Sequence, residues 1–169
     1  MSLGEMTPVG GTWDPCGFST PVAAPMTSAS VVSPRLIRIA AALLLGPDGR
    51  TLLVRKRNTR AFMQPGGKIE AHETPLQALA RELEEELGLR ITGEQASFLG
   101  QFSAPAANEP GFTVQAELFQ LSIAAQVTPA AEIEEVIWID PATDGDVELA
   151  PLTRDLILPF YRDSLTAIA

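Results

Sequence analysis

The order of hydrophobic and polar positions divides the chain after residue 34 into strand-like and helix-like segments. From Leu36 to Leu45 aliphatic side chains follow one another almost without a break, which is typical of a strand buried on both faces. Residues 46–49, Gly-Pro-Asp-Gly, predict a tight turn, after which residues 51–57 complete a hairpin. The remaining predicted strands cover residues 96–103, 112–123 and 133–140.

One segment has the period of an amphipathic helix and carries signals for both of its ends. Thr74 is a favourable N-cap, Pro75 suits the first helical position, and Gln77 completes a capping box with Thr74. Gly88 suits the left-handed conformation that ends a helix, so we place the helix at residues 75–87. Its apolar stripe comprises Leu76, Leu79, Ala80, Leu83 and Leu87.

Two irregularities are expected in the second half of the chain. Within residues 112–123 the apolar positions change phase at Leu118 and Phe119, which predicts a β-bulge there. A closing helix is predicted over residues 151–165, with a kink or break at Pro159. Several strands with two helices and mixed connections indicate an α/β sandwich with a mixed sheet, rather than a doubly wound sheet.

Chain length and composition favour one domain that has an extension. With 169 residues the chain is long enough for one sizeable core. Residues 1–34 are rich in Pro, Gly, Ser and Thr, so we expect a flexible or loosely docked N-terminal extension, followed by the domain over residues 35–169. The extension could pack against a second subunit, which leaves a homodimer open.

Hydropathy and cysteine usage indicate where the protein works. No apolar run approaches the roughly 20 residues of a membrane span, so no membrane partner is expected. The beginning of the chain does not resemble a secretory signal, and Cys16 is the only cysteine, which fits a reducing cytoplasm. The net charge of -9 argues against long nucleic acid as a partner.

Basic and acidic side chains are concentrated in neighbouring stretches. Two glycines, Gly66 and Gly67, lie directly before Lys68 and predict a loop whose backbone approaches a ligand closely. On the predicted helix, Glu82, Glu85 and Glu86 share one face, where like charges destabilise a helix by about 0.2–0.5 kcal/mol per pair. Mg²⁺ or Mn²⁺ would offset this repulsion, whereas a solvated acidic face is the alternative. The basic residues of this region are Arg55, Lys56, Arg57, Arg60 and Lys68.

The spacing from residue 67 to residue 89 resembles the complete signature of the Nudix hydrolase family. Gly67 is followed after five residues by Glu73 and after seven more by Arg-Glu-Leu-Glu-Glu-Glu-Leu-Gly-Leu at residues 81–89. The resemblance implies a mixed sheet sandwiched between helices. It also implies an enzyme that uses Mg²⁺ or Mn²⁺ to hydrolyse a diphosphate linkage in a nucleoside diphosphate derivative or nucleoside triphosphate, with a small nucleotide as its partner.

The resemblance further assigns roles to individual residues. Metal is expected at Glu82, Glu85 and Glu86, together with a backbone carbonyl of Gly66 or Gly67. Arg81 is expected to pair with these carboxylates and orient them, and Glu73 to support them. Metal-activated water would attack, and one carboxylate would take its proton. A further acid is expected among Glu132, Glu134 and Glu135, with Glu117 as a weaker candidate. The cations expected to hold a substrate phosphate are Lys68 and some of Arg55, Lys56, Arg57 and Arg60.

Other functions compete with hydrolysis. A Nudix domain that is catalytically weak and binds a nucleotide for regulation is the main alternative, although such domains usually lose signature acids that are all present here. The isomerase branch of the family needs a catalytic cysteine, for which Cys16 is badly placed. Base stacking and core packing both remain open for Phe62, Phe102 and Phe112.

Overall fold

The computed structural model describes residues 35–167, apart from residues 125 and 144–145. The expected extension over residues 1–34, with Cys16, lies outside the described residues. The strands are β1 (Arg35–Leu45), β2 (Thr51–Lys56), β3 (Gly66–Lys68), β4 (Ser97–Pro105), β5 (Phe112–Ser122) and β6 (Ile133–Ile139). The helices are α1 (Pro75–Leu87), the 3₁₀ turn η1 (Gly93–Gln95), the π-helical turn η2 (Thr153–Ile157) and α2 (Leu158–Thr166).

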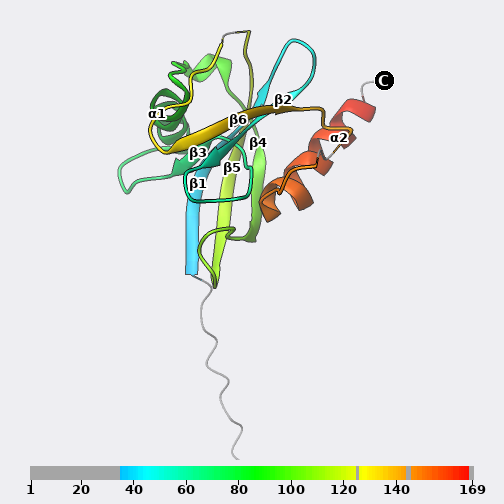
Figure 1. Ribbon diagram of the computed structural model, residues 1–169. Helices are drawn as coiled ribbons and strands as arrows, with labels where there is room; N and C mark the ends of the chain where they lie inside the picture. The colour runs from blue at the N-terminus through cyan, green and yellow to red at the C-terminus, as the bar shows by residue number, and fades with distance from the viewer. Residues whose placement is uncertain (1–34, 125, 144–145, 168–169) are drawn as a thin grey trace, which may run out of the picture. The chain divides into compact units, whose positions relative to one another are not determined.

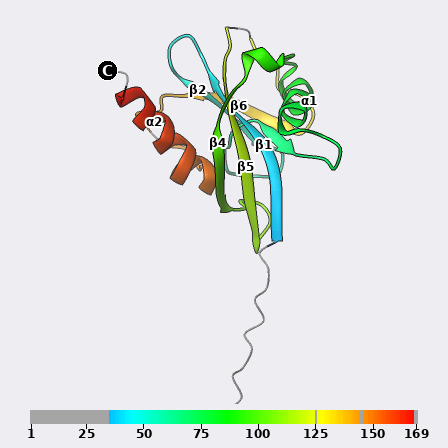
Figure 2. The same ribbon diagram turned by 180° about the vertical axis from the view of Figure 1, so that it is seen from behind.

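The strands form one mixed sheet, which confirms the predicted fold class. Its order is β4-β5-β1-β2-β6, and β3 also pairs with β1. Strand β1 lies parallel to β5 along its length, whereas the other pairs are antiparallel. Helix α1 covers one face of the sheet, and η2 with α2 covers the other (Figure 1); Figure 2 shows the same three layers from behind.

The predicted hairpin of β1 and β2 is paired at its turn and then opens. Leu45 pairs with Thr51 next to the turn, after which β2 runs along β6. Gly66 and Gly67, predicted to lie in a loop, instead belong to the short strand β3 beside β1. The glycine segment is therefore held in the middle of the sheet, where its backbone faces α1.

The phase change in β5 has a different cause from the one predicted. Strand β5 stays in register with β1 throughout, and the bulge lies opposite, in β4, where Phe98 pairs with Phe119 and Gly100 pairs with Leu118. Leu118 packs among the apolar residues under α2 and Phe119 among those under α1. Because both faces of the sheet are covered, apolar side chains at adjacent positions of β5 can be buried on opposite faces. The change of phase therefore does not require a β-bulge in β5.

Both helices begin and end near the predicted residues. Helix α1 has the predicted bounds, the capping box of Thr74 and Gln77, and a left-handed Gly88 with φ 66°. The closing helix extends from residue 151 to Thr166 and is irregular near Pro159, as predicted. Its irregularity is the π-helical turn η2, which precedes the proline. A proline ring clashes with the carbonyl four residues before it, and wider turns relieve such crowding.

Within residues 35–167, apart from residues 125 and 144–145, no helix has the length and apolar character needed to cross a membrane.

Candidate active site

Two glutamates of α1 lie against the glycine segment. Glu86 is buried, with 1% of its side chain exposed, and its Oε2 accepts a hydrogen bond of 3.0 Å from the Gly66 amide. Glu82 packs directly over Gly67, where an added Cβ would lie 2.2 Å from the carboxyl carbon. Gly66 has φ 137°, and a Cβ there would lie 2.1 Å from the Ala40 carbonyl oxygen. Only glycine at both positions allows the backbone to meet these carboxylates so closely.

Arg81 connects the glycine segment with three acidic side chains. Its Nε and Nη2 donate to Glu73 at 2.7 and 2.9 Å, and its Nη1 donates to Glu82 Oε1 at 2.8 Å. Nη2 also donates to the Lys68 carbonyl at 3.1 Å. Glu85, whose side chain is 55% exposed, lies 3.6 Å from Nη1. Arg81 thus fixes the Glu82 carboxylate, while Glu85 projects towards solvent.

The Glu73–Arg81 pair predicts a pH dependence of stability. Hydrogen bonds from Arg81 lower the pKa of Glu73 from 4.5 to about 2. A lowered pKa stabilises the folded state above the unfolded-state value near 4.5, and this contribution is lost as the pH falls from there towards 2. We expect Glu73→Gln to lower the urea midpoint at pH 7 and to approach the wild-type midpoint at pH 3. A constant difference between the two proteins across this range would contradict the assignment.

Lys56, the last residue of β2, supplies the counter-ion of Glu86. Its Nζ lies 3.1 Å from Glu86 Oε1, and it also contacts Glu132. Burial raises the pKa of Glu86, and Lys56 offsets part of that effect. Burial alone would lower the pKa of Lys56, but Glu86 and Glu132 outweigh it and leave the pKa raised. The ammonium therefore joins the buried acid of α1 to the loop that precedes β6.

The oxygen atoms at this place suit a hard divalent cation. Glu86 Oε1 is buried beside the Lys56 ammonium, and because a carboxylate oxygen has two lone pairs it retains coordinating capacity. Glu82 brings a second carboxylate against Gly67, and Mg²⁺ and Mn²⁺ prefer such ligands. In the described part of the chain no three acidic, histidine or cysteine side chains converge as a metal site would require. Arg81 and Lys56 hold two of the expected carboxylates, Glu82 and Glu86, and the more exposed Glu85 lies beside Arg81.

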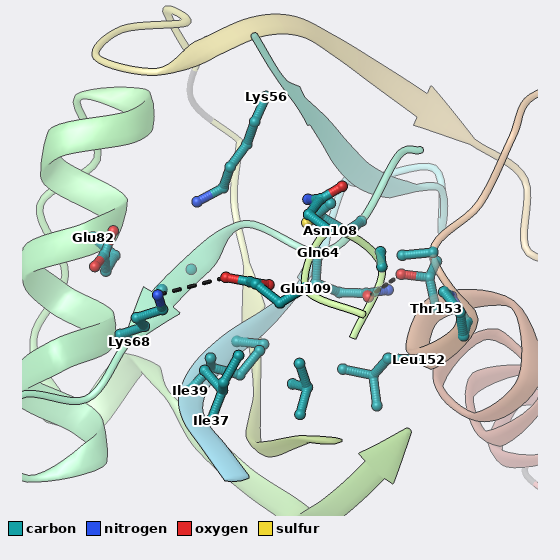
Figure 3. Close-up of a pocket in the computed structure, with 18 of the residues that line it drawn as sticks. Ile37, Ile39, Lys56, Gln64, Lys68, Glu82, Asn108, Glu109, Leu152 and Thr153 are labelled. Atoms are coloured by element: carbon teal, nitrogen blue, oxygen red, sulfur yellow. Dashed lines mark hydrogen bonds and ion pairs between the residues drawn. The ribbon is translucent and has the colours of Figure 1, made fainter. Parts of the chain in front are cut away.

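A pocket of about 400 Å³ is lined by Glu82 at one end and extends along β1 (Figure 3). This volume is in the range of small-molecule sites. One end is polar; at its mouth Lys68 lies 3.6 Å from Glu109 of the β4–β5 loop. The opposite end is bounded by apolar side chains and by a buried amide–hydroxyl pair. The polar end is lined by Lys56, Gly66, Gly67, Lys68, Glu82 and Glu132, and the opposite end includes Leu152, Gln64 and Thr153; Ile37, Ile39 and Val114 add apolar side chains to the wall.

Comparison with known families decides how this arrangement is classified. The model of the NUDIX domain matches residues 35–155, which is most of the chain and includes every element from β1 to the start of the closing helix. The chain belongs to the Nudix family. The signature resemblance over residues 67–89 is thereby confirmed, and the signature extends from within β3 through the following loop and α1 to Leu89.

Individual relatives are similar to different shares of the chain. A protein from Myxococcus xanthus named octanoyltransferase is 38% identical over 113 residues, which are 64% of this chain and 31% of that protein. An 8-oxo-dGTP diphosphatase from Haemophilus influenzae is 37% identical over 75 residues, 42% of this chain and 55% of that protein. The chain thus spans from about a third to about half of these relatives' lengths. The crystal structure of a MutT protein from Methanosarcina mazei Go1 matches with TM-score 0.66 and 24% identity, covering 79% of this chain and 98% of that one, and shows the fold.

The Nudix fold separates the basic residues predicted to meet phosphate. Arg55 pairs with Glu134 at 2.7 Å and with Glu135 at 2.9 Å, outside the pocket. Arg57 is exposed and does not line the pocket, whereas Lys56 and Lys68 do. Side chains alternate between the two faces of β2, which explains why Lys56 reaches the pocket and Arg55 does not. Leu52, Val54 and Lys56 lie on the face towards α1, whereas Arg55 lies on the opposite face. This signal was available in the sequence.

The candidate further acids are separated in the same way. Glu132 lines the pocket and contacts Lys56, whereas Glu134 and Glu135 are half exposed and are held by Arg55. Glu117 pairs with Arg38 at 3.4 Å and does not line the pocket. Among Glu117, Glu132, Glu134 and Glu135, Glu132 is therefore the one that lies near Glu82 and Glu86.

Aromatic stacking does not contribute to the described lining of the Nudix pocket. Phe62 is buried under the α2 layer, Phe102 packs edge-on against Phe160, and Phe112 lies beneath Arg35. None of the three is a lining residue. The polar groups that do line the far end, Gln64 and Thr153, were missed because nothing local in the sequence connects them.

Proposed function

We propose that the chain is a metal-dependent pyrophosphohydrolase that cleaves a diphosphate linkage in a nucleoside diphosphate derivative or a nucleoside triphosphate. The observation that carries the proposal is the position of Glu86. This buried carboxylate accepts a hydrogen bond from the Gly66 amide, and Gly66 lines the polar end of a pocket whose volume is in the range of small-molecule sites. The proposal is further supported by the relative named 8-oxo-dGTP diphosphatase, whose name refers to a small nucleotide.

Mg²⁺ or Mn²⁺ is the proposed cofactor. Glu82, Glu85 and Glu86, with a backbone carbonyl of Gly66 or Gly67, would hold it. When bound, such an ion neutralises phosphate charge and lowers the pKa of bound water towards neutrality. Glu85 would take part by turning its exposed side chain, since a rotation about its side-chain bonds costs little at the surface.

The side chains of the protein bind the substrate phosphates, orient the carboxylates and take up a proton. Arg81, anchored by Glu73, fixes Glu82 over Gly67. Lys56 and Lys68 present positive charge to the substrate phosphates at the polar end. The proton of the attacking water passes to a carboxylate at that end. Glu132 is the carboxylate there that comes from outside α1. A small nucleotide substrate and a single cysteine favour a cytoplasmic protein, and a homodimer stays a prediction.

The direct test is turnover of a nucleotide panel with Mg²⁺ or Mn²⁺, measured as release of phosphate and of pyrophosphate. We expect at least one nucleoside triphosphate or nucleoside diphosphate derivative to be cleaved, with activity abolished by a chelator and restored by either ion. Glu85→Gln should lower this turnover. Absence of turnover on the whole panel would refute the proposal, and tight nucleotide binding without turnover would establish the regulatory alternative.

A further inference from the structure

The far end of the pocket contains a buried amide that lacks a hydrogen-bond partner. Gln64 lines the pocket and is 5% exposed. Its Nε2 is buried and has no partner among the described residues. Buried amide groups are nearly always paired, and one left unpaired lowers stability. Such a group at the wall of a pocket is explained when a ligand provides the missing acceptor.

The amide is held in one orientation by a residue distant in the sequence. The Thr153 hydroxyl donates to Gln64 Oε1 at 2.7 Å, and Thr153 is fully buried (Figure 3). Thr153 opens the π-helical turn η2, and short π-helical segments occur frequently at functional sites. Because the oxygen of the amide accepts from Thr153, the group that remains for a ligand is the N–H donor.

The same segment of backbone connects this donor with the phosphate end. Gln64 precedes Pro65 and Gly66, and the Gly66 amide binds Glu86. Two residues span at most about 7 Å, so the separation of Gln64 from the carboxylates is fixed within narrow limits. The walls of the same pocket include Ile37, Ile39 and Val114, which suit the apolar faces of a planar ring.

We propose that Gln64 is a specificity-determining residue that donates a hydrogen bond to a carbonyl oxygen on the edge of the substrate's nucleobase. Guanine, uracil and thymine carry such an oxygen, whereas adenine and cytosine carry an amino donor at the corresponding position. An amino group would leave two donors facing each other, at a cost comparable to a lost hydrogen bond. The inference rests on the proposed function, because it assumes that a nucleotide occupies this pocket.

Calorimetry with nucleoside monophosphates tests the inference without requiring turnover. We expect the wild-type protein to bind GMP and UMP about tenfold more tightly than AMP and CMP, in line with one hydrogen bond gained or lost. Comparing GMP with UMP shows whether a purine or a pyrimidine is preferred. In Gln64→Met, which keeps the length of the side chain and removes the donor, the four affinities should become similar. Thr153→Val should reduce the discrimination because it frees the amide to rotate.

The matched control is Gln101→Met, which changes an exposed glutamine of β4 and should keep the wild-type affinity ratios. Unfolding curves of each variant show whether it is folded. A folded Gln64→Met that keeps the preference for GMP and UMP overturns the inference. A wild-type preference for AMP and CMP also overturns it, since the amide would then present its oxygen.

Turnover assays and calorimetry together distinguish failure of the proposed hydrolysis from failure of the proposed role of Gln64. Turnover of all four nucleoside triphosphates at equal kcat/KM, with equal affinities for the monophosphates, would refute the role of Gln64 and leave hydrolysis intact. Base discrimination in calorimetry without turnover of any nucleotide would refute hydrolysis and leave the role of Gln64 intact.

Discussion

Glu86→Gln is expected to lower kcat/KM by at least about a hundredfold, since removing one charged group from a preorganised site has effects of this size. Gln keeps the shape and the hydrogen bond from the Gly66 amide but removes the negative charge beside Lys56. The measurement is steady-state hydrolysis at saturating Mg²⁺, together with calorimetric titration of Mn²⁺, whose affinity should fall as well.

Glu84→Gln is the matched control for this substitution. Glu84 lies on the same helix, but it is half exposed and pairs with Arg90 at 2.7 Å, away from the pocket. We expect nearly wild-type kcat/KM and Mn²⁺ affinity from this variant. Equal losses in Glu84→Gln and Glu86→Gln would mean that the acidity of the helix, rather than the position of Glu86, matters.

Gly66→Ala is expected to give the largest loss of stability, roughly 3 kcal/mol or more from backbone strain and overpacking together. The residue has φ 137°, and an added Cβ would lie 2.1 Å from the Ala40 carbonyl oxygen, which belongs to the backbone of β1 and cannot move aside. Pairing of β3 with β1 should weaken, and Glu86 should lose its amide donor. Urea unfolding monitored by circular dichroism measures the effect.

Gly49→Ala separates the strain of a positive φ from the steric clash. Gly49 has φ 78° and nothing within 4 Å of an added Cβ. Its substitution should cost only about 1–2 kcal/mol, the usual penalty for a side chain in the left-handed region. If Gly66→Ala destabilises the protein no more than Gly49→Ala does, close contact of the glycine backbone with β1 is not what requires glycine.

Signals that lie within a few residues of one another predicted α1 completely. The capping box, the proline at the first turn and the terminal glycine all act locally, so the bounds of the helix followed from the sequence. Strand β3 could not be predicted in this way, because its three residues, two of them glycine, form a strand only by pairing with β1. The irregularity assigned to β5 was misplaced, because a single strand does not show that the sheet is covered on both faces.

The same distinction applies to the candidate site. The acids of the signature were identified from spacing on one helix, and Glu86 is indeed buried against the glycine segment. Which cations reach the pocket depends on the face of β2 on which they lie, and the hydrogen bond of Gln64 with Thr153 joins residues 89 positions apart. The packing of η2 against the end of the pocket creates this contact, so no local sequence pattern predicts it.

Lys56 of β2 contacts Glu86 and Glu132, so a cation of the same chain offsets part of the negative charge of α1. With Arg81 doing the same for Glu73 and Glu82, the repulsion among these carboxylates is largely cancelled inside the polypeptide. We therefore expect the domain to fold without a divalent ion, in contrast to small metal-stabilised domains that unfold when their ion is withdrawn.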